Sequence, residues 1–160
     1  MPNDIPARPL ADDELLIART FDAPRQLVFD MWAHGEHMRN WLGPVNSRCL
    51  EADLDFRVGG AWRALVRMPT HGDRAMGGRY LEIEPGRRIV MTFRWLNGEP
   101  DPESVVTLTF EDAGDGRTRQ TFHQAPFMSV ERRDSHIEGW NACFDSEQVY
   151  AERRTREIAE

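Results

Sequence analysis

The sequence contains no lysine: all 20 of its basic residues are arginine, against 27 acidic residues, and the formal net charge is −7. An acidic surface repels the phosphate backbone, so we do not expect nucleic acid as a partner. The arginines are scattered along the chain and form no basic cluster. We interpret the missing lysine as the codon bias of a GC-rich, bacterial genome.

Cysteine is scarce as well. Cys49 and Cys143 are the two cysteines, both within apolar-patterned segments, with no Cys-x-x-Cys pair and no zinc-type spacing. We expect two buried free thiols rather than a disulfide. His34 and His37 are three residues apart, but no third ligand accompanies them, and exposed polar side chains are the better interpretation. The sequence therefore predicts no metal site.

Long apolar runs and common catalytic motifs are also missing. Residues 1–13 carry three prolines and no apolar run, which does not fit a signal peptide or a membrane span. We expect a disordered tail there, no membrane partner and a cytoplasmic location. The sequence has no Gly-x-Ser-x-Gly, His-Glu-x-x-His, P-loop or dinucleotide fingerprint, so we expect no cofactor and set aside the commonest enzyme classes.

Hydrophobic periodicity predicts one domain over residues 14–155, followed by a tail at 156–160. A helix is predicted from Pro24, with apolar residues at helical spacing, and a short second helix runs through Met38, Trp41 and Leu42 after a break at Gly35. Ser129 is a suitable N-cap for a long last helix. Strands are predicted at 15–21, 47–56, 61–68, 79–84, 89–95, 105–111 and 117–124, with loops at 69–78 and 97–102.

This order indicates an α+β fold, because helices and hairpin-connected strands are segregated along the chain. A sheet can bury its apolar face economically by curving around one amphipathic helix. We therefore expect a curved antiparallel sheet of six to seven strands around a long C-terminal helix, with two short helices after the first strand.

Several short segments, in their order and spacing, resemble a known family. The segments are Phe21-Asp22-Ala23-Pro24, Trp41-Leu42-Gly43-Pro44, 57–62, 78–83, Arg88-Ile89-Val90, 106–110 and 136–140. Together they resemble the START-like (SRPBCC) superfamily, in the branch of homologues of the activator of heat-shock protein 90 ATPase. The resemblance implies a helix-grip fold with a cavity between sheet and helix. It also implies a lipid-like, polyketide-like or aromatic ligand, or a co-chaperone role.

The sequence departs from the family pattern on the last strand and the long helix. Gln120, Phe122 and Gln124 occupy cavity-facing positions where the family usually has leucines and a histidine, and Glu147 replaces a leucine. Glu147 either is solvated at the helix edge, or joins the two amides as the polar groups of an apolar pocket. Glu147 and His136 are the weak candidates for proton transfer. The expected ligand-binding residues are Trp41, Trp62, Met68, Met91, Phe93, Trp95, Gln120, Phe122, Gln124, Trp140, Phe144 and Glu147.

Three functions remain open at this point. The first is binding of a small, largely apolar or aromatic molecule between the helix and the sheet. The second is a cyclase- or hydrolase-like enzyme that uses the same cavity, and the third is a co-chaperone that binds a protein partner. A homodimer is compatible with each of them.

Overall fold

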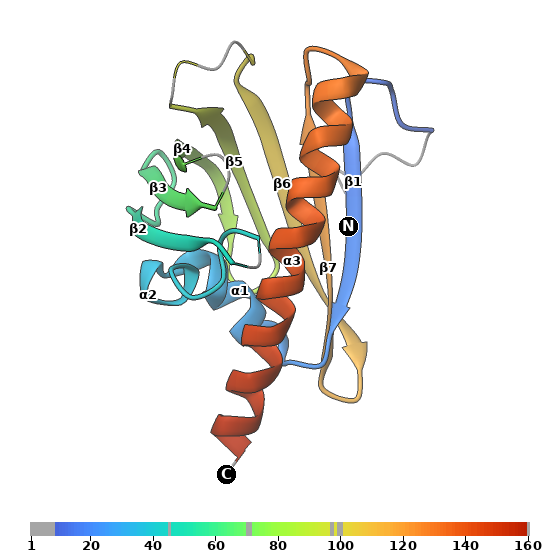
Figure 1. Cartoon of the computed structure of the whole chain (residues 1–160). Coiled ribbons are helices and arrows are strands. Elements are labelled where there is room, and N and C mark those ends of the chain that lie inside the picture. Colours follow the sequence, from blue (N-terminus) through green and yellow to red (C-terminus); the bar gives the residue numbers. More distant parts are fainter. Residues whose placement is uncertain (1–8, 45, 70–71, 97, 99–100, 160) are drawn as a thin grey trace.

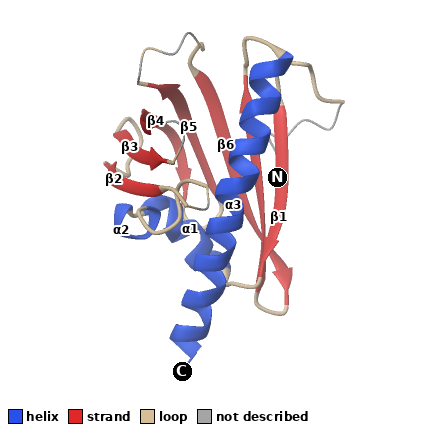
Figure 2. Cartoon of the chain, in the orientation of Figure 1, coloured by secondary structure: helices blue, strands red, loops and turns tan. Residues whose placement is uncertain are grey.

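Seven antiparallel strands form one curved sheet that wraps around a long helix (Figures 1 and 2). The computed structural model describes residues 9–44, 46–69, 72–96, 98 and 101–159. The strand order is β1-β7-β6-β5-β4-β3-β2, so β1 and β2 are the two edges. This is the predicted helix-grip α+β fold. The strands are β1 (Leu15–Phe21), β2 (Arg48–Leu54), β3 (Ala61–Met68), β4 (Gly72–Glu84), β5 (Arg88–Trp95), β6 (Ser104–Gly114) and β7 (Arg117–Ala125).

Helix α3 (Val130–Ala159) crosses the concave face of the sheet, as Figure 1 shows. The side chain of Ser129 accepts a hydrogen bond from the Arg132 N–H at 3.1 Å, which caps the first turn as expected. The helix continues through residues 156–159, which the sequence analysis assigned to a C-terminal tail. Most of the N-terminal tail expected at 1–13 lies outside the described residues. In the described part of the chain, no helix is long and apolar enough to cross a membrane.

Two short helices, α1 (Arg25–Ala33) and α2 (Gly35–Met38), follow β1. The first helix ends just before Gly35, as predicted, but the second is shorter than predicted, because α2 ends at Met38 and Trp41 and Leu42 follow it. Gly35 is required for close packing: a Cβ atom there would lie 2.1 Å from the backbone oxygen of Ala52 on β2. The glycine therefore lies at the break between the two helices and also allows the close contact with β2.

The predicted loop at 69–78 is the largest error in the fold. Strand β4 already begins at Gly72, and its residues 72–79 pair with the whole of β3. Trp62 lies opposite Gly78, and Ala64 lies opposite Met76. Residues 70–71 lie outside the described residues. Gly77 and Gly78 fell within the predicted loop, yet a Cβ at Gly78 would lie 2.0 Å from the Thr92 oxygen. Glycine is needed here because β4 and β5 approach closely.

The cysteines are free and buried, as expected. The ring centroids of His34 and His37 are 6.3 Å apart. Among the described residues, no group of three or more histidine, cysteine or acidic side chains could hold a metal ion.

A pair of glycine substitutions tests the close approach of β4 and β5. We expect Gly78→Ala to lower the free energy of unfolding by roughly 1–3 kcal/mol, because its Cβ would overlap backbone atoms. Gly139→Ala on α3 meets nothing within 4 Å and should raise it by about 0.5–1 kcal/mol through helix propensity. Urea unfolding of both variants measures the two free energies of unfolding. If Gly78→Ala is as stable as the wild type or more stable, β4 and β5 do not approach as closely as described.

Candidate functional site

A cavity of about 620 Å³ opens between the N-terminal half of α3 and the concave face of β3, β4 and β5. Its size is ordinary for a small-molecule site. The segment after α2 closes one side with Leu42, Gly43 and Pro44. The remaining lining residues are Val66, Met68, Pro69, Arg74, Met76, Phe93, Trp95, Arg132, Ser135, His136, Glu138, Gly139, Trp140, Ala142 and Cys143.

The regular spacing of strands and helix explains these walls. Alternate residues of a strand share one face, so Val66 and Met68 of β3, and Phe93 and Trp95 of β5, point toward α3. On α3, the lining residues Arg132, His136, Gly139 and Cys143 recur every three or four positions along one side of the helix, and further lining residues flank them. The cavity therefore has an aromatic and aliphatic sheet wall and a mixed helix wall.

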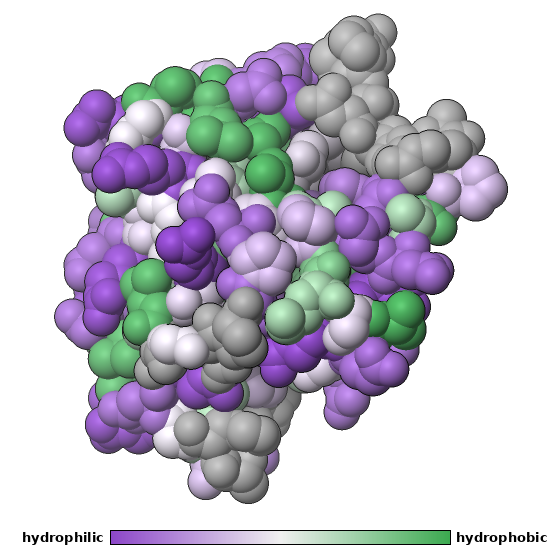
Figure 3. All heavy atoms as spheres, turned by 90° about the horizontal axis from the view of Figure 1, so that it is seen from above, coloured by the Kyte–Doolittle hydropathy of each residue, from purple (hydrophilic) through white to green (hydrophobic). Residues whose placement is uncertain are grey.

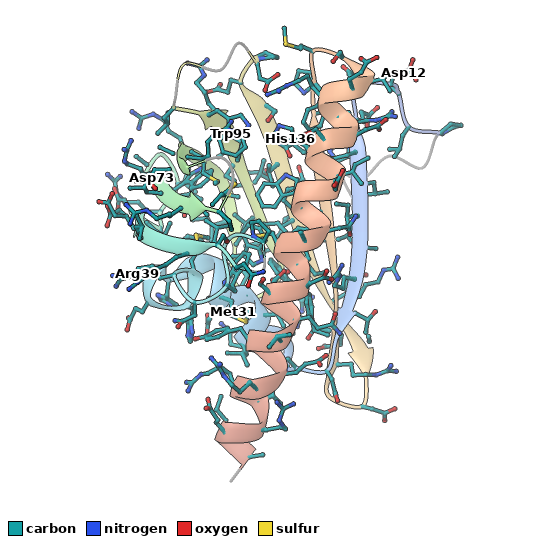
Figure 4. All side chains as sticks on the ribbon, in the orientation of Figure 1. Asp12, Met31, Arg39, Asp73, Trp95 and His136 are labelled. Carbon is teal, nitrogen blue, oxygen red and sulfur yellow. The ribbon has the colours of Figure 1, made fainter. Side chains whose placement is uncertain are left out.

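His136 lies on the helix wall and contacts the sheet directly. The Trp95 indole N–H donates to His136 Nε2 at 3.3 Å, and Figure 4 labels both residues between β5 and α3. The His136 ring also packs against Phe127, with centroids 4.9 Å apart, and against Phe93 at 6.0 Å. The indole contact requires Nε2 to be an acceptor, so this geometry fits a neutral imidazole. The pair links helix and sheet across the cavity.

Glu147 lies in the interior and is 0% exposed, so it is not solvated at the helix edge. Its Oε2 accepts a hydrogen bond from the Trp32 indole at 2.9 Å, and its Oε1 accepts one from the Gln120 amide at 3.0 Å. Burial raises the pKa of Glu147 from 4.5 to about 8, although these two hydrogen bonds and the charge of Arg19 lower it. The carboxyl group is therefore mostly protonated at neutral pH.

Gln124 does not line the cavity, but it holds the side chain of Trp140, which does. The Trp140 indole donates to Gln124 Oε1 at 2.8 Å, and the Gln124 amide donates to the Ser104 hydroxyl at 2.8 Å. Both Gln124 and Ser104 are buried. This chain from β6 through β7 to α3 fixes the edge of the indole, and the ring itself remains part of the cavity wall.

The expected site residues thus fall into two groups. Met68, Phe93, Trp95, His136 and Trp140 line the cavity. A second group lies outside its lining and belongs to the packed interior, where the Phe122 and Trp140 rings are in contact with centroids 4.7 Å apart and planes tilted by 47°. That group consists of Trp41, Trp62, Met91, Gln120, Phe122, Gln124, Phe144 and Glu147.

Sequence reasoning missed several lining residues. Arg74 and Met76 were hidden by the loop prediction at 69–78, although residues 74, 76, 78 and 80 continue the alternation of β4. Arg132 and Cys143 lie on the helix face that the Trp140 stripe defines, and that spacing was the available signal. The backbone N–H of Gly43 donates to Cys143 Sγ at 3.1 Å, and burial raises the pKa of this thiol, which stays protonated.

Residues 22–152 match the family described as activator of Hsp90 ATPase homolog 1-like protein (AHSA1). The chain belongs to this family. It is a branch of the START-like superfamily that is generally thought to bind small ligands. No curated protein matches the AHSA1-like chain.

Solved structures share the AHSA1-like fold. A protein from Chromobacterium violaceum is 26% identical with a TM-score of 0.79, and the match covers 89% of this chain and 99% of that one. The AHSA1 protein from Silicibacter pomeroyi is 21% identical with a TM-score of 0.75, covering 85% and 95%. A protein from Nitrosomonas europaea is 19% identical with a TM-score of 0.75, covering 90% and 97%. The latter two bear on the fold alone.

The buried carboxyl group of the AHSA1-like domain predicts a pH-dependent stability. Because folding raises the pKa of Glu147 from 4.5 to about 8, the folded state binds more protons between these pH values than the unfolded state does. Stability is therefore lost as pH rises through this window, by up to about 1.4 kcal/mol per pH unit. Glu147→Gln resembles the protonated side chain and removes the effect.

The measurement is urea unfolding of wild type and Glu147→Gln at several pH values. Relative to the variant, the wild type should become steadily less stable from about pH 5 to about pH 8. Glu138→Gln, at an exposed position of the same helix, serves as the control. A difference between wild type and Glu147→Gln that does not change with pH would show that this carboxyl group is not shifted.

Proposed function

We propose that this protein binds a small, largely apolar or aromatic molecule in the cavity between α3 and β3–β5. The observation that carries the proposal is the cavity itself, of about 620 Å³, with an aromatic and aliphatic wall on the sheet side. In a domain of this size, aromatic and methionine side chains normally fill the interior. Here Met68, Met76, Phe93, Trp95 and Trp140 border open space instead.

The positions of the two candidate proton-transfer groups favour binding over catalysis. Glu147 does not line the cavity, and both of its oxygens accept hydrogen bonds from Trp32 and Gln120. His136 lines the cavity, but its Nε2 accepts the Trp95 indole N–H. A general acid or base has to reach the reacting group directly or through one water. Glu147 does not meet this requirement, and the Nε2 atom of His136 is engaged by the Trp95 indole N–H.

The visible surface gives no support to a large partner-binding patch. A protein partner is usually bound through a contiguous exposed apolar area of several hundred Å². Seen from above, hydrophobic residues form several separate groups between hydrophilic ones (Figure 3). The co-chaperone alternative is therefore not favoured by this face.

Filling the cavity should abolish binding without removing any core side chain. Gly139 lines the cavity, and a Cβ atom there meets no atom within 4 Å, so Gly139→Leu adds bulk at low cost. We expect native mass spectrometry of the purified wild type to detect a bound molecule, or a screen of apolar and aromatic compounds to find a ligand that raises the melting temperature. Gly139→Leu should lose that adduct or shift.

The control for this experiment is Val149→Leu, a change of similar chemistry on the exposed side of α3 and outside the cavity. It should bind like the wild type. If the ligand binds Gly139→Leu as strongly as wild type, it occupies another site. If no compound binds the wild type and no adduct is found, the proposed function is wrong.

A further inference from the structure

A second pocket, of about 400 Å³, opens on the surface between the C-terminal half of α3 and the segment that follows α2. Leu42, Gly43 and Pro44 of that segment border both this surface pocket and the cavity, so the same residues form a wall of each. In Figure 1 the segment runs beside the middle of α3. The surface pocket is a separate candidate site, with a size that suits a small molecule.

The floor of the surface pocket consists of buried side chains. They are Trp41, Leu42, Cys49 and Tyr150. The hydroxyl group of Tyr150 is paired with Nδ1 of His37 at 2.7 Å, which fixes the tyrosine ring. Ser146, Tyr150 and Arg153 recur at intervals of four and three residues on α3, so their side chains share one face of the helix. That face forms the helix side of the pocket.

Two arginines border this pocket from different elements. Arg153 belongs to α3, and its guanidinium carbon lies 5.4 Å from the centroid of the Tyr150 ring. The ring contacts one face of the guanidinium group, and the N–H groups lie in the perpendicular plane. Arg39 follows the end of α2, where Figure 4 labels it. Among the described residues, neither guanidinium group has an ion pair or a hydrogen bond.

The charge at the floor of this pocket is positive, although the formal net charge of the chain is −7. Burial raises the pKa of Tyr150, and the charges of Arg154 and Arg153 lower it more than the nearby acidic residues raise it. Burial also raises the pKa of the Cys49 thiol to about 11, and the charge of Arg39 acts on it more strongly than the nearby carboxylate does. Among the described residues, no acidic side chain lines the pocket. Such a pocket attracts an anion.

We propose that this surface pocket binds the phosphate monoester group of a small molecule. Arg39 and Arg153 hold its oxygens from two sides, and the hydroxyl group of Ser146, which has no hydrogen-bond partner among the described residues, donates to it. One arginine fork matches a planar carboxylate. Two cations from different elements instead suit a tetrahedral group with three terminal oxygens and nearly two negative charges at neutral pH. The inference concerns a second site and does not rest on the proposed function.

The test is an NMR titration of the ¹⁵N-labelled protein with methyl phosphate, dimethyl phosphate and inorganic phosphate, at a pH about one to two units above the second pKa of a phosphate monoester, which is about 6. Dimethyl phosphate keeps the tetrahedral centre but has one terminal oxygen fewer and a single charge. None of the probes has a ring that the cavity would bind. Methyl phosphate should bind on the order of tenfold more tightly than dimethyl phosphate and shift the amide signals of residues 146–153.

Arg39→Met and Arg153→Met each remove one cation at an exposed position, so both variants should fold. Each should lower the affinity for methyl phosphate on the order of tenfold. Arg48→Met and Arg156→Met are the matched controls. Arg48 directly precedes Cys49 on β2, Arg156 follows Arg153 by three residues on α3, and both are exposed and do not line the pocket. They change the net charge equally and should bind like the wild type.

Three results would overturn the inference. The first is equal affinity for methyl and dimethyl phosphate, or no saturable shift with either. The second is binding of inorganic phosphate without binding of methyl phosphate, because the pocket would then take only the free anion. The third is an equal loss of affinity in all four variants, which would show attraction to the general charge of the surface. None of these results bears on the cavity, whose ligand is tested with Gly139→Leu.

Discussion

The packing of Trp140 between α3 and the sheet is the contact on which the rest of the structure depends. Its ring packs against Phe122 of β7, with centroids 4.7 Å apart, and the indole N–H donates to Gln124. The same ring forms part of the cavity wall. Trp140 therefore separates a filled region of the interior from an open one. The filled region fixes the helix on the sheet, and the open region is then left available for a ligand.

The filled region is unusual in its polarity. The Gln120–Glu147–Trp32 group and the Ser104–Gln124–Trp140 group tie β6 and β7 to α1 and α3 through buried hydrogen bonds. Buried polar groups with partners add directional constraints that apolar packing lacks. These networks explain how amide and carboxyl side chains can be buried in an otherwise apolar interior, because each has hydrogen-bond partners. The Ser104–Gln124–Trp140 group orients the Trp140 side of the cavity wall. Gln120, Gln124 and Glu147 themselves do not line the cavity.

The sequence was sufficient to predict the fold, because hydrophobic periodicity is a local signal. The alternation of Trp62, Ala64 and Val66, and the helical spacing of Trp140 and Phe144, identify the inward faces of β3 and α3 correctly. Gln120 and Gln124, predicted to face the cavity, are buried but lie outside its lining. The alternation fails at Gly77 and Gly78, where glycine serves the close approach of β4 to the backbones of β3 and β5 and not a turn.

The candidate site was harder to predict, for a physical reason. Periodicity tells which face of an element is buried, but it does not tell how far apart two elements lie at a given depth. Phe93 and Phe122 both point inward, yet space remains beside Phe93 while Phe122 is packed against Trp140 and Phe144. That difference arises from the curvature of the sheet and the tilt of α3. Arg74 was missed for another reason. The first half of β4 contains several glycines and charged residues, and it was therefore predicted to be a loop.

The central claim is that ligand enters the space beside Trp95 and Trp140. The five tryptophans of the chain give five indole N–H signals, and two of these residues line the cavity while Trp32, Trp41 and Trp62 do not. Titration of a ¹⁵N-labelled sample with an aromatic ligand measures all five together. The account predicts shifts of the Trp95 and Trp140 signals that saturate, with the other three nearly unchanged. Saturating shifts confined to Trp32, Trp41 or Trp62, or no shift at any tryptophan, would contradict it.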